Sequence, residues 1–146
     1  SIFPSPLPDF SLSGYSGPLM YIFVGMPGSG KTTYYSQHLK PLDWIHANQD
    51  TLKTKRKLLD CIDRSLSSGK SVAVDCTNPS RSKRAEYLSI AIKYNTPSLI
   101  LYFVRDGHGF NKLREKPVPS IAYSMYYKNL EEPSLEVDGV NVFPIS

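Results

Sequence analysis

The sequence predicts an α/β fold, in which a parallel sheet of four to five strands is flanked by helices and carries a short helical lid. An uninterrupted apolar run, Leu19 to Val24, is typical of a strand covered on both faces. A glycine-rich turn and a helical segment follow it directly, and further apolar runs then alternate with segments of helical periodicity. Such alternation implies right-handed crossovers and places ligands at the carboxyl ends of the strands.

Helices and strands alternate along the rest of the chain. Apolar spacing and flanking breakers predict helices over 32–39, 52–68 and 121–130, and another that opens at Asn78–Ser80 and closes at Asn95. Short apolar runs predict strands that begin at Trp44 and cover 71–74 and 99–104, with an edge strand over 140–143. We interpret the polar, basic stretch 107–116 as the lid, although a connecting helix fits its composition equally well.

Length and composition favour one domain. The chain has 146 residues, 40% of them hydrophobic, and residues 1–18 hold four prolines among serines and glycines. We therefore expect a linker or strap over 1–18 and the folded domain over 19–146. Because the chain begins with Ser1, we expect it to be a piece of a longer protein. No apolar run is long enough to span a membrane, so we expect an intracellular protein without a membrane partner.

A phosphate-binding loop lies between the first strand and the first helix. The segment GMPGSGKTT at 25–33 fits the pattern GxxxxGK[ST]. Glycines let the backbone curl until N–H groups point at phosphates, and the next helix adds the positive end of its dipole. Lys31 then reaches the β and γ phosphates, and the Thr32 hydroxyl is placed to bind Mg²⁺. The sequence thus predicts a site for ATP and Mg²⁺ made of Gly25, Pro27, Gly28, Ser29, Gly30, Lys31, Thr32 and Thr33.

Two aspartates are expected at the same edge of the sheet. Asp50 follows the second predicted strand and Asp75 ends the third. In a kinase, Asp50 would take the proton of the acceptor hydroxyl, although its place before a helix fits an N-cap equally well. Three roles stay open for Asp75: binding Mg²⁺ through water, holding the phosphate-loop lysine, or capping a turn.

The remaining features favour a kinase with an anionic acceptor. A guanine-specific NKxD sequence is absent, and there is no long mechanical segment. The two cysteines and three histidines lack metal-ligand spacing, so any metal should arrive with the nucleotide. The net charge is +4, and basic residues cluster at 53–57 (KTKRK) and 81–84 (RSKR). Each cluster follows a segment that should end near the phosphate loop, which favours a polyanionic partner.

Three further segments resemble the kinase domain of eukaryotic polynucleotide kinase/phosphatase. They are NQDTL at 48–52, VAVDCTNPSRSKRAEY at 72–87 and the KLRE to YKNLEEP region at 112–133. The similarity runs from about Leu19 to Phe143, and its most specific part is DxTNP. The resemblance implies transfer of the γ phosphate of ATP to the 5′-hydroxyl end of DNA or RNA, with DNA favoured, by a nuclear enzyme of strand-break repair.

The resemblance also implies roles for individual residues. Asp50 is the general base, and Asp75 supports the ATP and Mg²⁺ site. The incoming strand lies near Asn78, Arg81 and Arg84. The lid supplies a cation to the transferring phosphoryl group from Lys112 or Arg114.

The chain departs from the family pattern in three places. Gln49 precedes Asp50 where arginine is common. The lid offers Lys112 and Arg114 where an arginine pair is usual, and lysine cannot fork two hydrogen bonds to a phosphate. The DxDGT motif of the phosphatase half is absent from this sequence, so we expect a 3′-phosphatase domain elsewhere in the full-length protein.

Two alternatives differ in their acceptor or activity. A small-molecule kinase for a nucleoside or sugar would need few cations, and the two basic clusters argue against it. A nucleic-acid-binding module with a vestigial ATP site would not need Lys31, Thr32 and Asp50, which are all intact.

Overall fold

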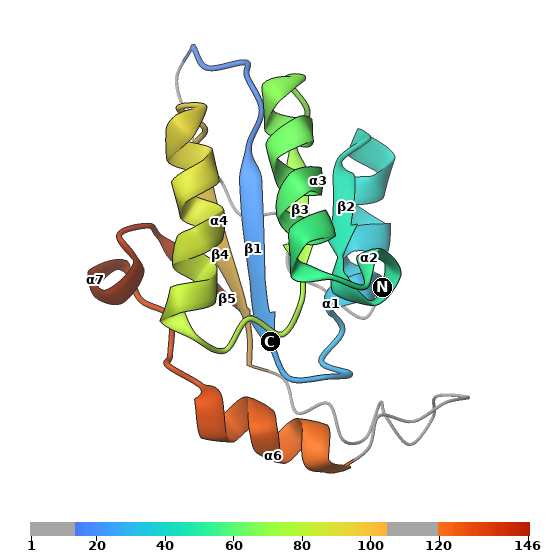
Figure 1. The fold of residues 1–146 in the computed structure, drawn as a ribbon, viewed down its shortest axis with the longest axis vertical. Coiled ribbons are helices and arrows are strands. Elements are labelled where there is room, and N and C mark those ends of the chain that lie inside the picture. The colour runs from blue at the N-terminus through green and yellow to red at the C-terminus, as the bar shows by residue number, and fades with distance from the viewer. Residues whose placement is uncertain (1–13, 105–119) are drawn as a thin grey trace.

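The centre of the fold is a five-stranded parallel sheet with the order β2-β3-β1-β4-β5 (Figure 1). This computed structural model describes residues 14–104 and 120–146. The strands are β1 (Met20–Gly25), β2 (Ile45–Asn48), β3 (Val72–Asp75), β4 (Ser98–Phe103) and β5 (Val142–Ile145). The predicted α/β fold with a parallel sheet is confirmed.

Both faces of the sheet are covered, which explains the uninterrupted apolar run of β1. All six residues of β1 are buried. Its alternate residues Met20, Ile22 and Val24 pack in a core with α3 (Lys55–Ser67) and α4 (Arg81–Lys93). Tyr21 and Phe23 pack on the opposite face, against the segment that follows the phosphate loop. The result is a three-layered domain.

The segment after the phosphate loop is not the regular α-helix predicted over 32–39. It consists of α1 (Lys31–Tyr34), a π-helical turn η1 (Tyr35–Leu39) and a 3₁₀ turn η2 (Lys40–Leu42). The neighbouring residues Tyr34 and Tyr35 are both buried, the first beside Phe23 and the second beside His46. A regular helix points adjacent side chains about 100° apart, and the wider turn accompanies the burial of both rings.

The helix predicted over 52–68 begins later, as α3 (Lys55–Ser67), and a short helix that was not predicted, α2 (Gln49–Leu52), precedes it. Asn48 caps α2, because its side chain accepts from the Thr51 amide. The chain then turns at Lys53, whose φ is 73°, and Thr54 caps α3 through its hydroxyl. The break occurs because Thr54 offers a second cap three residues before the Lys57 amide.

The helix predicted over 121–130 is confirmed as α6 (Ser120–Asn129), although two apolar residues of its helical spacing lie at the surface. Ile121 and Met125 are 67% and 55% exposed. The buried side chains are Tyr123 and Tyr126, which pack against Met26 of the phosphate loop. Figure 1 shows α6 beyond the carboxyl end of β1.

The last part of the chain also differs from the prediction. A short helix, α7 (Leu135–Asp138), occupies residues with no predicted element and ends at Gly139. The edge strand β5 consequently begins two residues later than predicted and pairs with β4. Over the parts of the chain that the structure describes, no helix is long and apolar enough to cross a membrane.

The strand order places a crevice at the carboxyl end of β1. From β1 the chain proceeds to β2 on one side, and β4 pairs with β1 on the other side. Ligands of open α/β sheets bind where the strand order changes direction in this way. The phosphate-binding loop, Asp50 and Asp75 all lie at this edge.

Candidate active site

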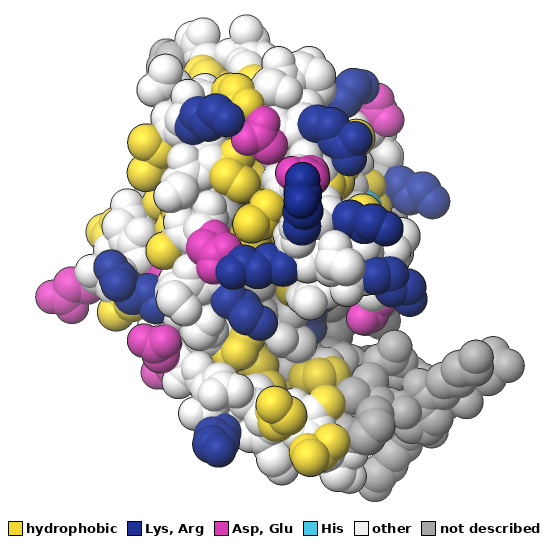
Figure 2. Space-filling model, in the orientation of Figure 1, with side chains coloured by type: hydrophobic (Ala, Val, Ile, Leu, Met, Phe, Trp, Pro, Cys, Tyr) yellow, Lys and Arg dark blue, Asp and Glu magenta, His cyan; other side chains and the backbone are white. Residues whose placement is uncertain are grey.

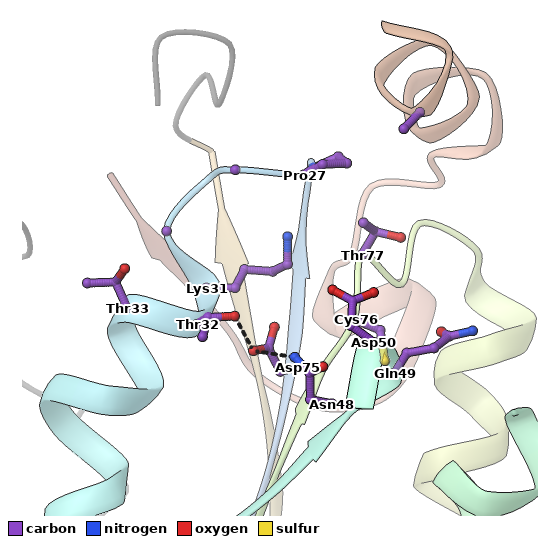
Figure 3. Close-up of a pocket in the computed structure, with 13 residues that line it drawn as sticks. Pro27, Lys31, Thr32, Thr33, Asn48, Gln49, Asp50, Asp75, Cys76 and Thr77 are labelled. Carbon is purple, nitrogen blue, oxygen red and sulfur yellow. Dashed lines mark hydrogen bonds between the residues drawn. The ribbon is translucent and has the colours of Figure 1, made fainter. Parts of the chain in front are cut away.

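A cavity of about 580 Å³ opens at this edge of the sheet. It is lined by residues from the phosphate loop, the ends of β2 and β3, and α6: Pro27, Gly28, Gly30, Lys31, Thr32, Thr33, Asn48, Gln49, Asp50, Asp75, Cys76, Thr77 and Ala122. Figure 3 shows Lys31 and Asp50 on two sides of the view, with Asp75 below Lys31 and joined to Thr32 and Asn48. The structure therefore brings together the three residues on which the kinase hypothesis depends.

Backbone geometry explains the glycines of the phosphate loop. Gly28 and Gly30 have φ values of 77° and 96°, in the left-handed region that favours glycine. A Cβ on Gly25 would lie 2.7 Å from the Ser29 hydroxyl and 2.8 Å from the Cβ of Phe103. The loop can therefore curl tightly only because these positions carry no side chain.

Lys31 is folded over the start of the loop. Its ammonium donates to the carbonyls of Gly25 and Met26, at 2.9 and 2.8 Å, and the residue is 8% exposed. These contacts hold a positive charge inside the loop. Phosphate oxygens that enter the loop would meet this cation together with backbone N–H groups.

Asp75 is the centre of a hydrogen-bond cluster. Its Oδ2 accepts from Thr32 Oγ1 at 2.8 Å, from His46 Nε2 at 2.7 Å and from Asn48 Nδ2 at 3.2 Å. Burial alone would raise the pKa of Asp75, but the hydrogen bonds from His46 and Thr32 and the charge of Lys31 hold it below its ordinary value. The carboxylate is therefore ionised at neutral pH and fixed in one orientation.

The Thr32 and Asp75 pair fits Mg²⁺. All three hydrogen bonds of Asp75 end on Oδ2, and within the described residues Oδ1 accepts none. A hydroxyl and a carboxylate oxygen are the hard ligands that Mg²⁺ prefers, and a few protein ligands suffice because the ion keeps waters and phosphate oxygens. Across 14–104 and 120–146, no group of three His, Cys, Asp or Glu side chains could hold a metal alone.

Asp50 is not a helix N-cap, so that alternative was wrong. Asn48 caps α2, and Asp50 lies in its first turn. The residue is exposed and lines the cavity. Its carboxylate is therefore available to a substrate rather than used to satisfy the helix.

Sequence reasoning missed the two β2 side chains that fix Asp75. His46 and Asn48 both donate to Asp75, and the His46 ring stacks on Tyr35, with centroids 4.0 Å apart and an interplanar angle of 9°. Alternation along β2 puts positions 46 and 48 on one face of the strand, which was the available signal. The partner strand could not be read from the sequence, since Asn48 lies opposite Asp75 only through the β2–β3 register.

The three residues that the resemblance placed near an incoming strand have different environments. Asn78 is 1% exposed, donates to the carbonyl of Phe23 at 2.8 Å and accepts from the Tyr87 hydroxyl at 2.8 Å. Arg84 is 0% exposed and forms an ion pair with Asp138 at 2.9 Å.

Side chains buried in this way have no surface to offer a polynucleotide. Asn78 and Arg84 therefore hold the fold around the site, and the substrate contacts predicted for them are corrected here. Arg81 is exposed, and its Nε donates to the carbonyl of Val137. The lid residues Lys112 and Arg114 lie outside the described residues, as does most of the predicted strap over 1–18.

Comparison with known proteins relates this chain to one family. A family model described as an AAA domain matches residues 20–60. The chain is 34% identical over 128 residues to a protein of Acanthamoeba polyphaga mimivirus named for bifunctional polynucleotide phosphatase/kinase activity. The match covers 80% of this chain and 30% of the viral protein. The chain is a relative of the polynucleotide phosphatase/kinases. The resemblance to their kinase domain is confirmed.

Two further proteins resemble this chain, one in sequence and one in fold. The bifunctional polynucleotide phosphatase/kinase of Schizosaccharomyces pombe is 29% identical over 129 residues, which cover 83% of this chain and 32% of that protein. The crystal structure of a fungal RNA kinase has a TM-score of 0.74 at 14% identity, and the match covers 90% of this chain and 39% of that structure. The chain spans about a third of the length of the two polynucleotide phosphatase/kinases that it matches.

Proposed function

We propose that this domain is an ATP-dependent polynucleotide 5′-hydroxyl kinase. The observation that carries the proposal is the position of Asp50, whose carboxylate lines the same cavity as Lys31 and Thr32 (Figure 3). The names of the two related phosphatase/kinases support a polynucleotide as the acceptor.

The reaction follows from the two sides of the cavity. Asp50 accepts the proton of the 5′-hydroxyl while the oxygen attacks the γ phosphorus of ATP. The new O–P bond forms as the bond to the β phosphate oxygen breaks, and ADP leaves. Lys31 and the loop N–H groups balance the charge that develops on the phosphates. Thr32 and Asp75 would hold Mg²⁺, which would supply further charge neutralisation when bound.

Charge on the acceptor side supports a polynucleotide. Figure 2 shows lysines and arginines gathered on the face covered by α3 and α4, with some acidic residues among them. Six basic residues at or near the start of these helices are exposed: Lys53, Lys55, Arg56, Lys57, Arg81 and Lys83. Strand ends that approach Asp50 from this side would meet a positive field, which favours a chain of phosphates over a neutral sugar.

The test is transfer of labelled phosphate from ATP. We expect label on DNA oligonucleotides with a 5′-hydroxyl, less on RNA, and none on the same DNA with a 5′-O-methyl end. If only thymidine or gluconate becomes labelled, the acceptor is a small molecule and the polynucleotide assignment is wrong. Tight binding of ATP and DNA without transfer would indicate a binding module instead of a kinase.

The wider setting forms part of the same proposal. We propose a nuclear role in strand-break end repair and a 3′-phosphatase domain joined to this one. The bifunctional names of the two relatives support the joined phosphatase. Full-length transcripts should encode a DxDGT motif, and a fluorescently tagged full-length protein should accumulate in nuclei. Transcripts without that motif would refute the joined phosphatase.

A further inference from the structure

A second, smaller cavity lies beside the candidate active site. Its volume is about 60 Å³, and its lining residues are Gln49, Lys55, Leu58, Lys83, Glu86 and Tyr87. Gln49 also lines the larger cavity, so the two cavities meet at this residue. Because Asp50 follows Gln49 directly, a polymer whose end lies at Asp50 can continue past this second cavity.

Only one of the two lysines in the small cavity has its charge uncompensated. The ammonium of Lys55 lies 2.8 Å from a carboxylate oxygen of Glu86, which neutralises it. Lys83 is exposed and forms no ion pair with any described residue. The cavity thus presents one open positive charge.

The size and charge of the small cavity limit which chemical group of a ligand can bind there. Pockets for drug-sized ligands are roughly 300–1,000 Å³, so a cavity of about 60 Å³ has no room for a nucleoside. Its walls include the buried side chains of Leu58 and Tyr87, which are 2% and 4% exposed. A single anionic group at the mouth of the cavity, bound by Lys83, matches both properties.

We propose that Lys83 binds the first internucleotide phosphodiester of the acceptor strand. In a polynucleotide this anion follows the terminal sugar, on the side away from the 5′-hydroxyl that lies at Asp50. The inference rests on the proposed kinase function and adds the residue that distinguishes a polynucleotide from a free nucleoside. Lys83 acts by binding, so its loss should raise KM more than it lowers kcat.

The experiment combines a variant with a change in the substrate. Two 5′-hydroxyl oligonucleotides are compared, one with all natural linkages and one with an uncharged methylphosphonate as the first linkage only. Each is assayed with the wild-type protein, Lys83→Gln, Lys83→Arg and Lys40→Gln. Lys40 is exposed on η2 and lines neither cavity, so its variant controls for the loss of one positive charge.

We expect the wild-type protein to use the natural linkage about tenfold better in kcat/KM, as for one charge-assisted phosphate contact. Lys83→Gln should lose this preference, whereas Lys83→Arg and Lys40→Gln should keep it. An unchanged preference in Lys83→Gln, or an equal loss in Lys40→Gln, would overturn the inference and leave the kinase assignment intact. A wild-type protein that phosphorylates neither oligonucleotide would refute the proposed function itself.

Discussion

The hydroxyl of Thr32 donates a 2.8 Å hydrogen bond to the carboxylate of Asp75, although 43 positions separate the two residues. This bond joins the phosphate-binding loop to the end of β3. Because Asp75 also accepts from His46, the position of the Thr32 oxygen depends on β2 as well. Three segments of the chain thus fix the oxygen proposed to bind the metal.

Thr32→Val should lower phosphoryl transfer strongly and stability only slightly. The variant keeps the side-chain shape but removes the hydroxyl, while Asp75 retains His46 and Asn48. We expect a loss of about 1 kcal/mol in unfolding free energy, as for one hydrogen bond, and a transfer rate at least tenfold lower. Thr32→Ser is the control and should keep most of the activity. Equal activity of the valine and serine variants would argue against a ligand role for the hydroxyl.

Stability should depend on pH through Asp75. Its folded-state pKa is lowered, since the hydrogen bonds from His46 and Thr32 and the charge of Lys31 outweigh burial. A carboxyl with a lowered pKa stabilises the fold above its unfolded value of about 3.9, and this contribution disappears as the pH falls through the folded pKa.

Urea unfolding of the wild type and Asp75→Asn at pH 7, 5 and 3 measures this contribution. The wild type should be more stable by about 1–3 kcal/mol at pH 7 and 5, and the gap should shrink toward pH 3. A gap that grows as the pH falls would contradict the lowered pKa.

Asp50→Asn should abolish transfer while ATP still binds. The amide keeps the size of the side chain but cannot take the proton of the acceptor, and general bases typically contribute about 10²–10⁴-fold. Label transfer and calorimetric binding of ATP separate the two effects. Asp43→Asn is a matched control, because the Asp43 side chain is 97% exposed and does not line the cavity. Wild-type turnover in Asp50→Asn would exclude Asp50 as the base.

Arg84→Met and Arg81→Met should differ in stability. Replacing Arg84 leaves the buried carboxylate of Asp138 without its partner, which typically costs about 3–5 kcal/mol. Arg81 is exposed, so its replacement should change unfolding free energy by less than about 0.5 kcal/mol. Denaturant unfolding measures both. Similar stability of the two variants would show that the Arg84 ion pair is not needed for folding.

Cys76 should resist alkylation although it lines the cavity. Burial raises its pKa to about 12, and the thiolate is the reactive form. Cys61 is only partly buried. Iodoacetamide at neutral pH should therefore modify Cys61 in the folded protein and Cys76 only after unfolding. The Cys61→Ser variant isolates the second thiol, and rapid labelling of this variant in its native state would contradict the raised pKa.

Short sequence patterns correctly predicted the parts of the fold that are determined by residues close together in the sequence. The apolar run before Gly25 was sufficient for a doubly covered strand, and GxxxxGKT was sufficient for the loop, since both are set within about ten residues. The register between two strands depends on residues that are far apart in the sequence. The contact of His46 with Asp75 arises because β2 pairs with β3, and the spacing of residues in the sequence does not predict that pairing.

The errors concerned residues whose roles depend on distant partners. Arg84 looked like part of a basic surface cluster, but Asp138 and three carbonyls bury its guanidinium. Ile121 and Met125 had helical spacing, yet the aromatic face of α6 packs against Met26 instead. In both cases the decisive partner lies more than 50 positions away, so a local pattern could not identify it.

Two hydrogen bonds tie the loop after β3 to β1. The amide of Gly25 donates to the carbonyl of Thr77 at 3.1 Å, and the Asn78 side chain donates to Phe23 at 2.8 Å. The two segments therefore share hydrogen bonds that opening of either one must break, and they should form one cooperative unit of local unfolding. A thermal fluctuation that disturbs the phosphate-binding loop should then also disturb the segment after β3.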